Sequence, residues 1–72
     1  MKSAVFTAPT TIAGASTPSG AKTTPHVPPG GFQRTYYDPR IEHLRVEVYE
    51  DGVKPPKVTM VPISRVQSWE PA

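Results

Sequence analysis

Residues 1–31 consist largely of small residues, proline and glycine, and this composition limits what the chain can fold into. Of these 31 residues, 23 are Ala, Pro, Gly, Ser or Thr. Proline lacks the amide proton that helices and sheets use, and glycine loses more backbone entropy on folding than any other residue. We therefore expect the folded part of the chain to be residues 32–72, which follow the pair Gly30-Gly31.

The expectation for residues 1–31 is an extended arm. A flexible tail is the simpler reading of such a segment, which stays disordered alone and pays its ordering entropy only on binding. An arm that lies along a neighbouring subunit is favoured because the segment has little charge and spaces single apolar side chains along its length. The arm residues expected to contact a partner are Phe6, Ile12 and Val27.

A core built from about 41 residues is small, and such cores usually need a disulfide, a metal or a partner surface. The chain has no cysteine, which excludes disulfides and thiolate metal sites. His26 and His43 have no cluster of further ligands beside them, so no metal or cofactor is predicted. Ser64 lacks the Gly-x-Ser-x-Gly context of a nucleophile, and so small a core cannot shield an active site. We expect no catalytic residue and no enzyme.

The formal net charge of +2 at pH 7 comes from the arm. Lys2 and Lys22 are the only charged residues before residue 32, and the six basic and six acidic residues that follow cancel. A nucleic-acid binder normally concentrates Lys and Arg on one face, so nucleic acid is not the expected partner. The apolar runs are far shorter than the roughly 20 residues that span a bilayer, so a membrane is not expected either. The N-terminus lacks the apolar stretch of a signal peptide and is read as mature protein.

Residues 32–37 carry the densest group of aromatic side chains, Phe32, Tyr36 and Tyr37. So small a fold needs large side chains for its core, and a core position is expected for Phe32. Tyr36 and Tyr37 are expected to contact a partner. Stacking of these rings on nucleobases, helped by nearby arginines, is the third interpretation.

The pair Asp38-Pro39 is a helix-start signal and predicts a single turn over about residues 39–43. Residues 44–50 then alternate apolar and polar side chains, which is typical of a half-exposed strand. A helix over residues 38–50 is the competing interpretation, and the β-branched residues favour the strand. The side chains expected on its inner face are Leu44, Val46 and Val48.

Asp51-Gly52 predicts a turn, and Pro55-Pro56 lengthens that turn into a loop. Residues 57–61 are the predicted return strand, and Pro62 ends its ladder because proline has no amide proton. On this strand we expect Val58 and Met60 to face the core and Val61 to face outward, toward a partner.

Residues 64–67 fit the capping-box pattern and predict one helical turn, after which residues 66–69 form a short third strand. Trp69 either closes the small core or forms an interface hot spot, and we expect closure. The predicted fold is mainly β, a small three-stranded meander or incomplete barrel preceded by the extended arm. Its expected core residues are Phe32, Leu44, Val46, Val48, Val58, Met60 and Trp69.

The stretch LRVEVYEDGVKPPKVTMVPISRVQSWEP, residues 44–71, resembles the ends of many small proteins encoded by tailed bacteriophages. The shared pattern is a charged strand, an irregular turn, and a second strand that ends in a Val/Ile-Pro pair. A Ser-x-Val step then leads into a final strand with an aromatic residue and Glu. The matching positions are Val61-Pro62, Ser64, Val66, Trp69 and Glu70. The resemblance implies a virion protein, because accessory capsid proteins of phages often combine a small β fold with an extended arm.

We therefore expect a structural protein, a minor virion component of the cement or decoration type. It is expected to bind and bridge capsid subunits through the arm and a β edge, and to be located in the virion after assembly in the host cytoplasm. Association with further copies of the chain is left open. One alternative is a small phage regulatory protein that binds a host enzyme such as RNA polymerase. The other is a single-stranded nucleic-acid-binding protein that uses Tyr36, Tyr37 and Trp69.

Overall fold

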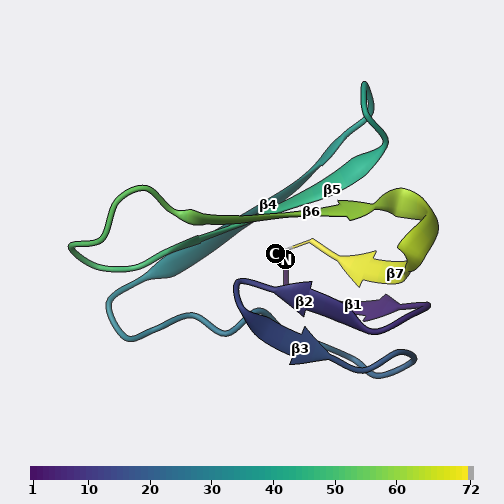
Figure 1. Cartoon of the computed structure of the whole chain (residues 1–72), viewed down its shortest axis with the longest axis horizontal. Helices are drawn as coiled ribbons and strands as arrows, with labels where there is room; N and C mark the ends of the chain where they lie inside the picture. The colour runs from purple at the N-terminus through teal and green to yellow at the C-terminus, as the bar shows by residue number, and fades with distance from the viewer. Residues whose placement is uncertain (72) are drawn as a thin grey trace.

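The computed structural model describes residues 1–71, which form a mainly β fold as predicted (Figure 1). The largest sheet has three antiparallel strands in the order β4–β5–β6, and two further sheets have two strands each. Within this range the sheets do not close into a barrel. The elements are β1 (Ser3–Phe6), β2 (Thr10–Ile12), β3 (Ala15–Thr17), β4 (Phe32–Asp38), β5 (His43–Tyr49), β6 (Lys57–Pro62), the 3₁₀ turn η1 (Ile63–Arg65) and β7 (Val66–Glu70).

The central strand β5 is confirmed with the predicted inner face. Leu44, Val46 and Val48 alternate along it and are at most 2 % exposed. Alternation is what allows one face of a strand to be buried while the other meets water. Burying three such side chains stabilises the fold by several kcal/mol in total, at about 1.5–3 kcal/mol for each.

The return strand β6 is also confirmed, but the predicted orientation of its side chains is wrong. Val61 is 1 % exposed, whereas Val58 and Met60 are 41 % and 37 % exposed. The reason is the register, which pairs Leu44 with Val61. Residues directly opposite each other in an antiparallel pair share a face of the sheet, so Val61 faces the core with Leu44. Val58 and Met60 then face outward.

The structure also differs from the expected division into an arm and a domain. Residues 1–31 form β1, β2 and β3, which lie on the inner side of the three-stranded sheet (Figure 1). Phe6 and Ile12, expected to contact a partner, are 0 % and 3 % exposed and belong to the core. Together with Met1 and Ala4 they pack in one cluster with the buried valines and Leu44 of the sheet. The isolated apolar side chains of residues 1–31 therefore pack this segment against the three-stranded sheet of the same chain.

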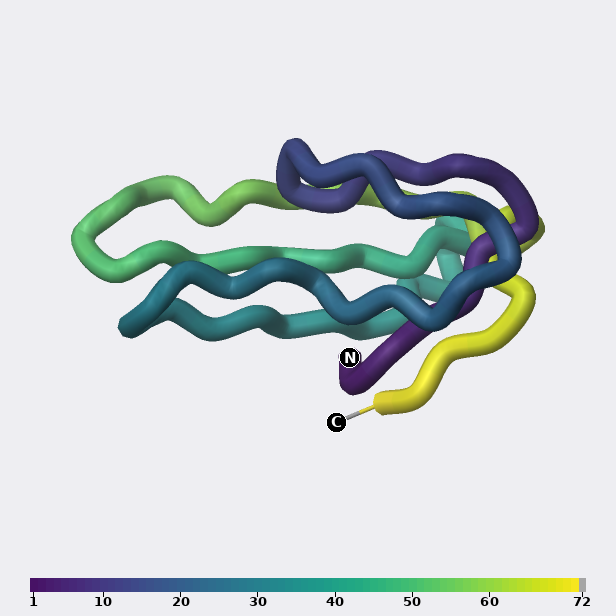
Figure 2. Tube along the Cα trace, turned by 90° about the horizontal axis from the view of Figure 1, so that it is seen from below, coloured from purple at the N-terminus to yellow at the C-terminus, as the bar shows by residue number. Residues whose placement is uncertain are grey.

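Hydrogen bonds hold β1 on both sides. On one side β1 pairs antiparallel with β7, so the first and last strands lie side by side (Figure 2). On the other side the amides and carbonyls of Ala4 and Thr23 exchange two hydrogen bonds of 2.8 Å. The predicted third strand is thus confirmed as β7, but it pairs with β1 and does not continue the sheet of β5 and β6, whose third strand is β4. Trp69 lies opposite Ala4 and packs, partly buried, against the edge of the core.

A two-residue turn joins β2 to β3 and explains why the hairpin forms despite its weak sequence signal. Ala13 and Gly14 both have positive φ, 49° and 84°. Positive φ at both central positions is the requirement of the turn that best matches the twist of paired strands. Asn-Gly is the usual sequence for such a turn, so Ala-Gly does not predict it.

The two predicted helical turns have different outcomes. Residues 39–42 form a non-helical turn between β4 and β5, in which Asp38 Oδ1 accepts a hydrogen bond from the Arg40 amide at 3.0 Å. The helix over residues 38–50 is therefore excluded, because β4 and β5 occupy most of that range. The second turn is present as η1, but it begins after Pro62 without a side-chain cap, so the capping role of Ser64 is wrong.

Candidate interaction face

The three-stranded sheet has one face on the core and a second face that points away from it, here called the outer face. No element within residues 1–71 covers the outer face, because the remaining strands all lie on the inner side (Figure 1). Strand alternation and the two registers place eleven side chains on it. They are Phe32, Arg34, Tyr36 and Asp38 of β4, His43, Arg45, Glu47 and Tyr49 of β5, and Val58, Met60 and Pro62 of β6.

Large apolar side chains are exposed on the outer face. Phe32 is 58 % exposed and Tyr36 is 36 % exposed on one edge strand, and Val58 and Met60 are exposed on the other, with β5 between the two strands. The predicted core positions of Phe32, Val58 and Met60 are therefore wrong. Phe32 stacks on Tyr49 across the β4–β5 pair, with ring centroids 4.4 Å apart and ring planes 9° apart. One side of the Phe32 ring thus contacts Tyr49 and much of the rest meets solvent.

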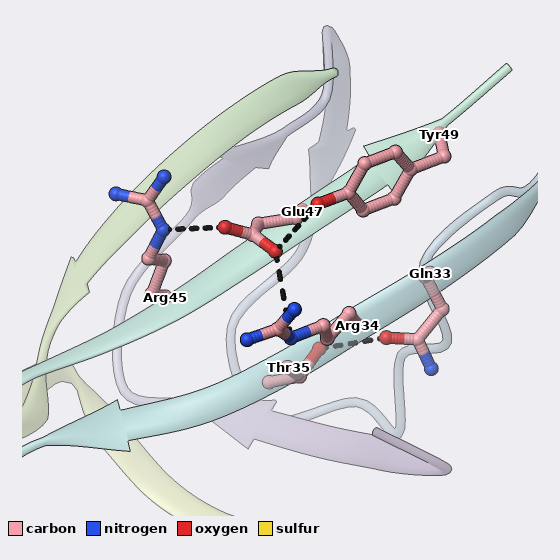
Figure 3. Close-up of polar contacts among 6 residues, drawn as sticks. All are labelled: Gln33, Arg34, Thr35, Arg45, Glu47 and Tyr49. Atoms are coloured by element: carbon pink, nitrogen blue, oxygen red, sulfur yellow. Dashed lines mark hydrogen bonds and ion pairs between the residues drawn. The ribbon is translucent and has the colours of Figure 1, made fainter.

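Glu47 is a buried carboxylate in the middle of this face. It is 5 % exposed, and three outer-face side chains surround it (Figure 3). Arg45 Nε donates a hydrogen bond to Glu47 Oε2 at 2.7 Å, and the Tyr49 hydroxyl donates one to Oε1 at 3.0 Å. Arg34 Nε lies 3.8 Å from Oε1 and completes the set. Hydrogen bonds to a charged group are stronger than neutral ones, so this cluster holds its side chains in place.

The same contacts shift the ionisation of the cluster. The hydrogen bond from Arg45 is the main reason that the pKa of Glu47 is lowered from its ordinary 4.5, and it outweighs the opposing effect of burial. The pKa of Arg45 is raised by the same bond. The pKa of Tyr49 is raised from 10.0, because its hydroxyl donates to a carboxylate. At neutral pH the cluster therefore holds two arginines, one carboxylate and one neutral tyrosine.

Arg34 also lies over the ring of Tyr36, with its guanidinium carbon 5.2 Å from the ring centroid, within the range of a cation–π contact. Tyr37, the next residue, points to the opposite face and is 38 % exposed there. Trp69 lies on β7 in another sheet. The structure thus does not bring Tyr36, Tyr37 and Trp69 together as one stacking platform.

The residues predicted to contact a partner have separate locations. Tyr36 and Tyr37 are exposed, as that role requires, on opposite faces of β4. Val61 is buried in the core, as are Phe6 and Ile12, and Val27 is half-buried. Sequence reasoning missed Arg45, Glu47 and Tyr49. Their alternation was visible in residues 44–50, but the buried carboxylate depends on Arg34 from another strand.

A groove of about 720 Å³ adjoins the outer face beside the Phe32–Tyr49 stack. Its walls are those two rings, the Gly30-Gly31 pair and the loop of residues 50–56. A Cβ at residue 31 would clash with the backbone carbonyl of Tyr49, so only glycine allows this close approach. The Gly30-Gly31 pair therefore holds the segment before β4 close to the end of β5.

Within residues 1–71 no group of three or more His, Cys, Asp or Glu side chains is arranged to hold a metal ion. No helix in the described chain has the length and apolar character needed to cross a membrane. Comparison of the chain with protein-family models, with curated proteins and with solved structures found no match.

Proposed function

We propose that the protein is a non-enzymatic structural protein that attaches to a protein subunit of a larger assembly through the outer face. The observation that carries this proposal is the group of exposed apolar side chains on one uncovered sheet face, Phe32, Tyr36, Val58 and Met60. Aromatic residues and methionine are enriched in protein interfaces. Exposed apolar patches on a small protein commonly mark an interaction site.

The charges of the outer face favour a protein partner over nucleic acid. Arg34 and Arg45 both contact the single carboxylate of Glu47, and Arg40 pairs with Asp38 at 3.4 Å. Arginines held in such pairs have less freedom to neutralise phosphates, which supply most of the affinity of nucleic-acid binders. A face whose polar side chains are already fixed loses less conformational entropy when a partner docks on it.

We further propose that the assembly is a virion and that the protein acts there as a cement or decoration component. The resemblance of residues 44–71 to the ends of small tailed-phage proteins supports this reading. The arm of residues 1–31 is no longer the proposed attachment, because Phe6 and Ile12 fill the core of their own chain. Attachment through a rigid sheet face takes its place, adding contact area between the protein and a capsid subunit.

The experiment that tests the virion part is a search for the protein in purified particles. Particles grown from a genome that carries the gene are banded on a density gradient and analysed by quantitative mass spectrometry. The proposal expects the protein at a fixed number of copies per particle, retained through a second gradient. Absence from particles, with the protein bound instead to a host enzyme, would favour the regulatory alternative.

Single-stranded nucleic-acid binding remains the second candidate, because the rings of Phe32, Tyr36 and Tyr49 share one sheet face with two arginines. Aromatic rings on a sheet can stack on bases without regard to sequence. The salt dependence of binding to an oligonucleotide separates the two candidates.

A further inference from the structure

Strand β4 is an open edge of the three-stranded sheet. Its seven residues pair with β5 in an unbroken register, and the structure of residues 1–71 shows no strand on its other side. Such an edge presents unpaired backbone amides and carbonyls that can pair with another strand. Proteins usually protect long edges with proline, charged side chains, a bulge or a covering segment. β4 contains no proline, lysine or bulge, and its two charged residues, Arg34 and Asp38, pair with Glu47 and Arg40 of the same chain.

The opposite edge of the same sheet is protected. Pro56 precedes β6 and Pro62 is its last residue, and proline cannot donate to a neighbouring strand. The hairpin of β2 and β3 also approaches β6, because the Ala13 amide donates a hydrogen bond of 3.0 Å to the Thr59 hydroxyl. Of the two edges of this sheet, the β4 edge is therefore the one left both long and regular.

We propose that β4 pairs antiparallel with β4 of a second copy of the chain, which joins the two sheets into one of six strands. A two-fold axis perpendicular to the sheet relates the copies, and such an isologous contact closes at a dimer. The two outer faces then lie on the same side and form one continuous surface. This dimer goes beyond the outer-face docking proposed above, and neither requires the other.

The sequence of β4 selects the register of this pairing. When Thr35 lies on the two-fold axis, all seven residues of β4 find a partner and Arg34 lies opposite the partner subunit's Tyr36. Arg34 already contacts Tyr36 within its own chain, so the pairing repeats a contact that the strand favours. Thr35 then faces the partner subunit's Thr35, and threonine pairs across strands are favourable.

The other registers that keep the two outer faces together are poorer. With Arg34 on the axis, two arginines lie directly opposite each other, and like charges in that position are destabilising. With Tyr36 on the axis, Phe32 and Gln33 extend beyond the paired region, and the turn after β4 meets the end of the partner strand. Thr35 is therefore the predicted centre.

Two measurements test the dimer. Sedimentation equilibrium of the unmodified protein should show a mass that rises with concentration to twice the monomer mass. Cysteine cross-linking tests the register, and the natural chain has no cysteine to interfere. Under mild oxidation Thr35→Cys should form a disulfide-linked dimer at least about ten times faster than Ser68→Cys. Ser68 is the control because it is exposed on β7, so random collisions would cross-link it at least as readily.

A monomer mass up to millimolar concentration would overturn the dimer, as would equal cross-linking at residues 35 and 68. Faster cross-linking of Tyr36→Cys than of Thr35→Cys would overturn the register. Thr35→Cys removes the hydroxyl that donates to Gln33 Oε1 at 2.7 Å, so circular dichroism must first show that the variant is folded (Figure 3). If it is not, the mass of the unmodified protein decides. Failure of the dimer would leave outer-face docking untouched, because Met60, on the strand at the other edge, tests docking separately.

Discussion

Leu44 and Val61 lie directly opposite each other in the β5–β6 pair, and both side chains are almost completely buried, at 0 % and 1 % exposure. This one pairing decides which face of the sheet meets the core. Shifting β6 by a single residue would send Val61 outward and bring its apolar neighbours inward. The outer face, and with it the proposed docking surface, depends on this register.

Two valines of β6 test the register as a matched pair. Val61→Ala removes buried methyl groups and should lower the free energy of unfolding by about 1.5–3 kcal/mol. Val58→Ala changes a side chain that is 41 % exposed and should cost less than about 1 kcal/mol. Urea denaturation followed by Trp69 fluorescence measures both. Equal losses, or a larger loss at Val58, would contradict the register.

The N-terminal residues are predicted to be essential to the fold. Phe6→Ala should cost about 3–5 kcal/mol, the usual loss for a buried aromatic side chain. Deleting residues 1–31 removes three strands and four core side chains, so the remaining chain should not fold. Circular dichroism and amide NMR dispersion check both variants. A well-dispersed spectrum from residues 32–72 alone would show that residues 1–31 are an arm after all.

The stability of the protein should fall in acid partly because Glu47 becomes protonated. Its pKa is lower in the folded state than its ordinary 4.5. Its contribution is therefore complete above about pH 4.5 and is lost as the pH falls through the folded value. Glu47→Gln should destabilise the protein by about 1–2 kcal/mol at pH 7, since it removes a charged hydrogen-bond acceptor.

The comparison of pH profiles isolates this effect. Between pH 7 and pH 3 the free energy of unfolding should fall less steeply for Glu47→Gln than for the unmodified protein. Asp38→Asn is the control, because the pKa of Asp38 is also lowered, by hydrogen bonds from Arg40, but this ion pair is exposed. Exposed pairs contribute little to stability. A Glu47→Gln profile as steep as that of the unmodified protein would show that the cluster does not hold the carboxylate.

Nucleic-acid binding should be weak. The net charge is +2, and the arginines of the outer face are already paired. Fluorescence anisotropy with a labelled oligothymidylate should give a salt slope of no more than about two to three phosphates. If the protein bound the oligonucleotide with sub-micromolar affinity at physiological salt, and Tyr36→Ala abolished this binding, the outer face would instead be identified as a base-stacking surface.

Some patterns in the sequence were sufficient to predict individual strands. The alternation of Leu44, Val46 and Val48 with polar side chains predicted β5 and its inner face, because apolar residues at every second position all point to the same side of a strand. The order of the last three strands could also be read, since turn residues mark each boundary. The sequence could not show which side chains of β6 face the core, because Val58, Met60 and Val61 are all apolar. Only the pairing with β5 shows that Val61 faces inward and the other two face outward.

The N-terminal segment was misread because its composition hides its pattern. In β1 and β2 the buried positions alternate with the exposed or half-buried ones, but most of the side chains are Ala, Ser or Thr. Phe6 and Ile12 therefore looked isolated, although each is the largest member of a buried row. The partner strand of β1 is β7, at the other end of the chain, and composition carries no signal for such a distant pairing.

The candidate face was visible only in part. Tyr36 was singled out together with nearby arginines, and one of these, Arg34, does lie over its ring. The alternation of residues 44–50 placed Glu47 on the polar face of a half-exposed strand. It could not indicate that this carboxylate is buried, because the burial comes from side chains on two strands. A period-2 pattern shows which residues share a face of one strand, and the register is needed to show which neighbours they meet.

Tyr36 and Tyr37 provide the most direct test of the outer face as the docking surface. They are adjacent on one strand and almost equally exposed, at 36 % and 38 %, but they lie on opposite faces. The measurement is the number of copies bound per purified particle for Tyr36→Ala, Tyr37→Ala and Met60→Ala, each first shown to be folded. Tyr36→Ala and Met60→Ala should each reduce occupancy at least about ten-fold, whereas Tyr37→Ala should retain it. Retention of both outer-face variants, or loss of Tyr37→Ala alone, would contradict docking through this face.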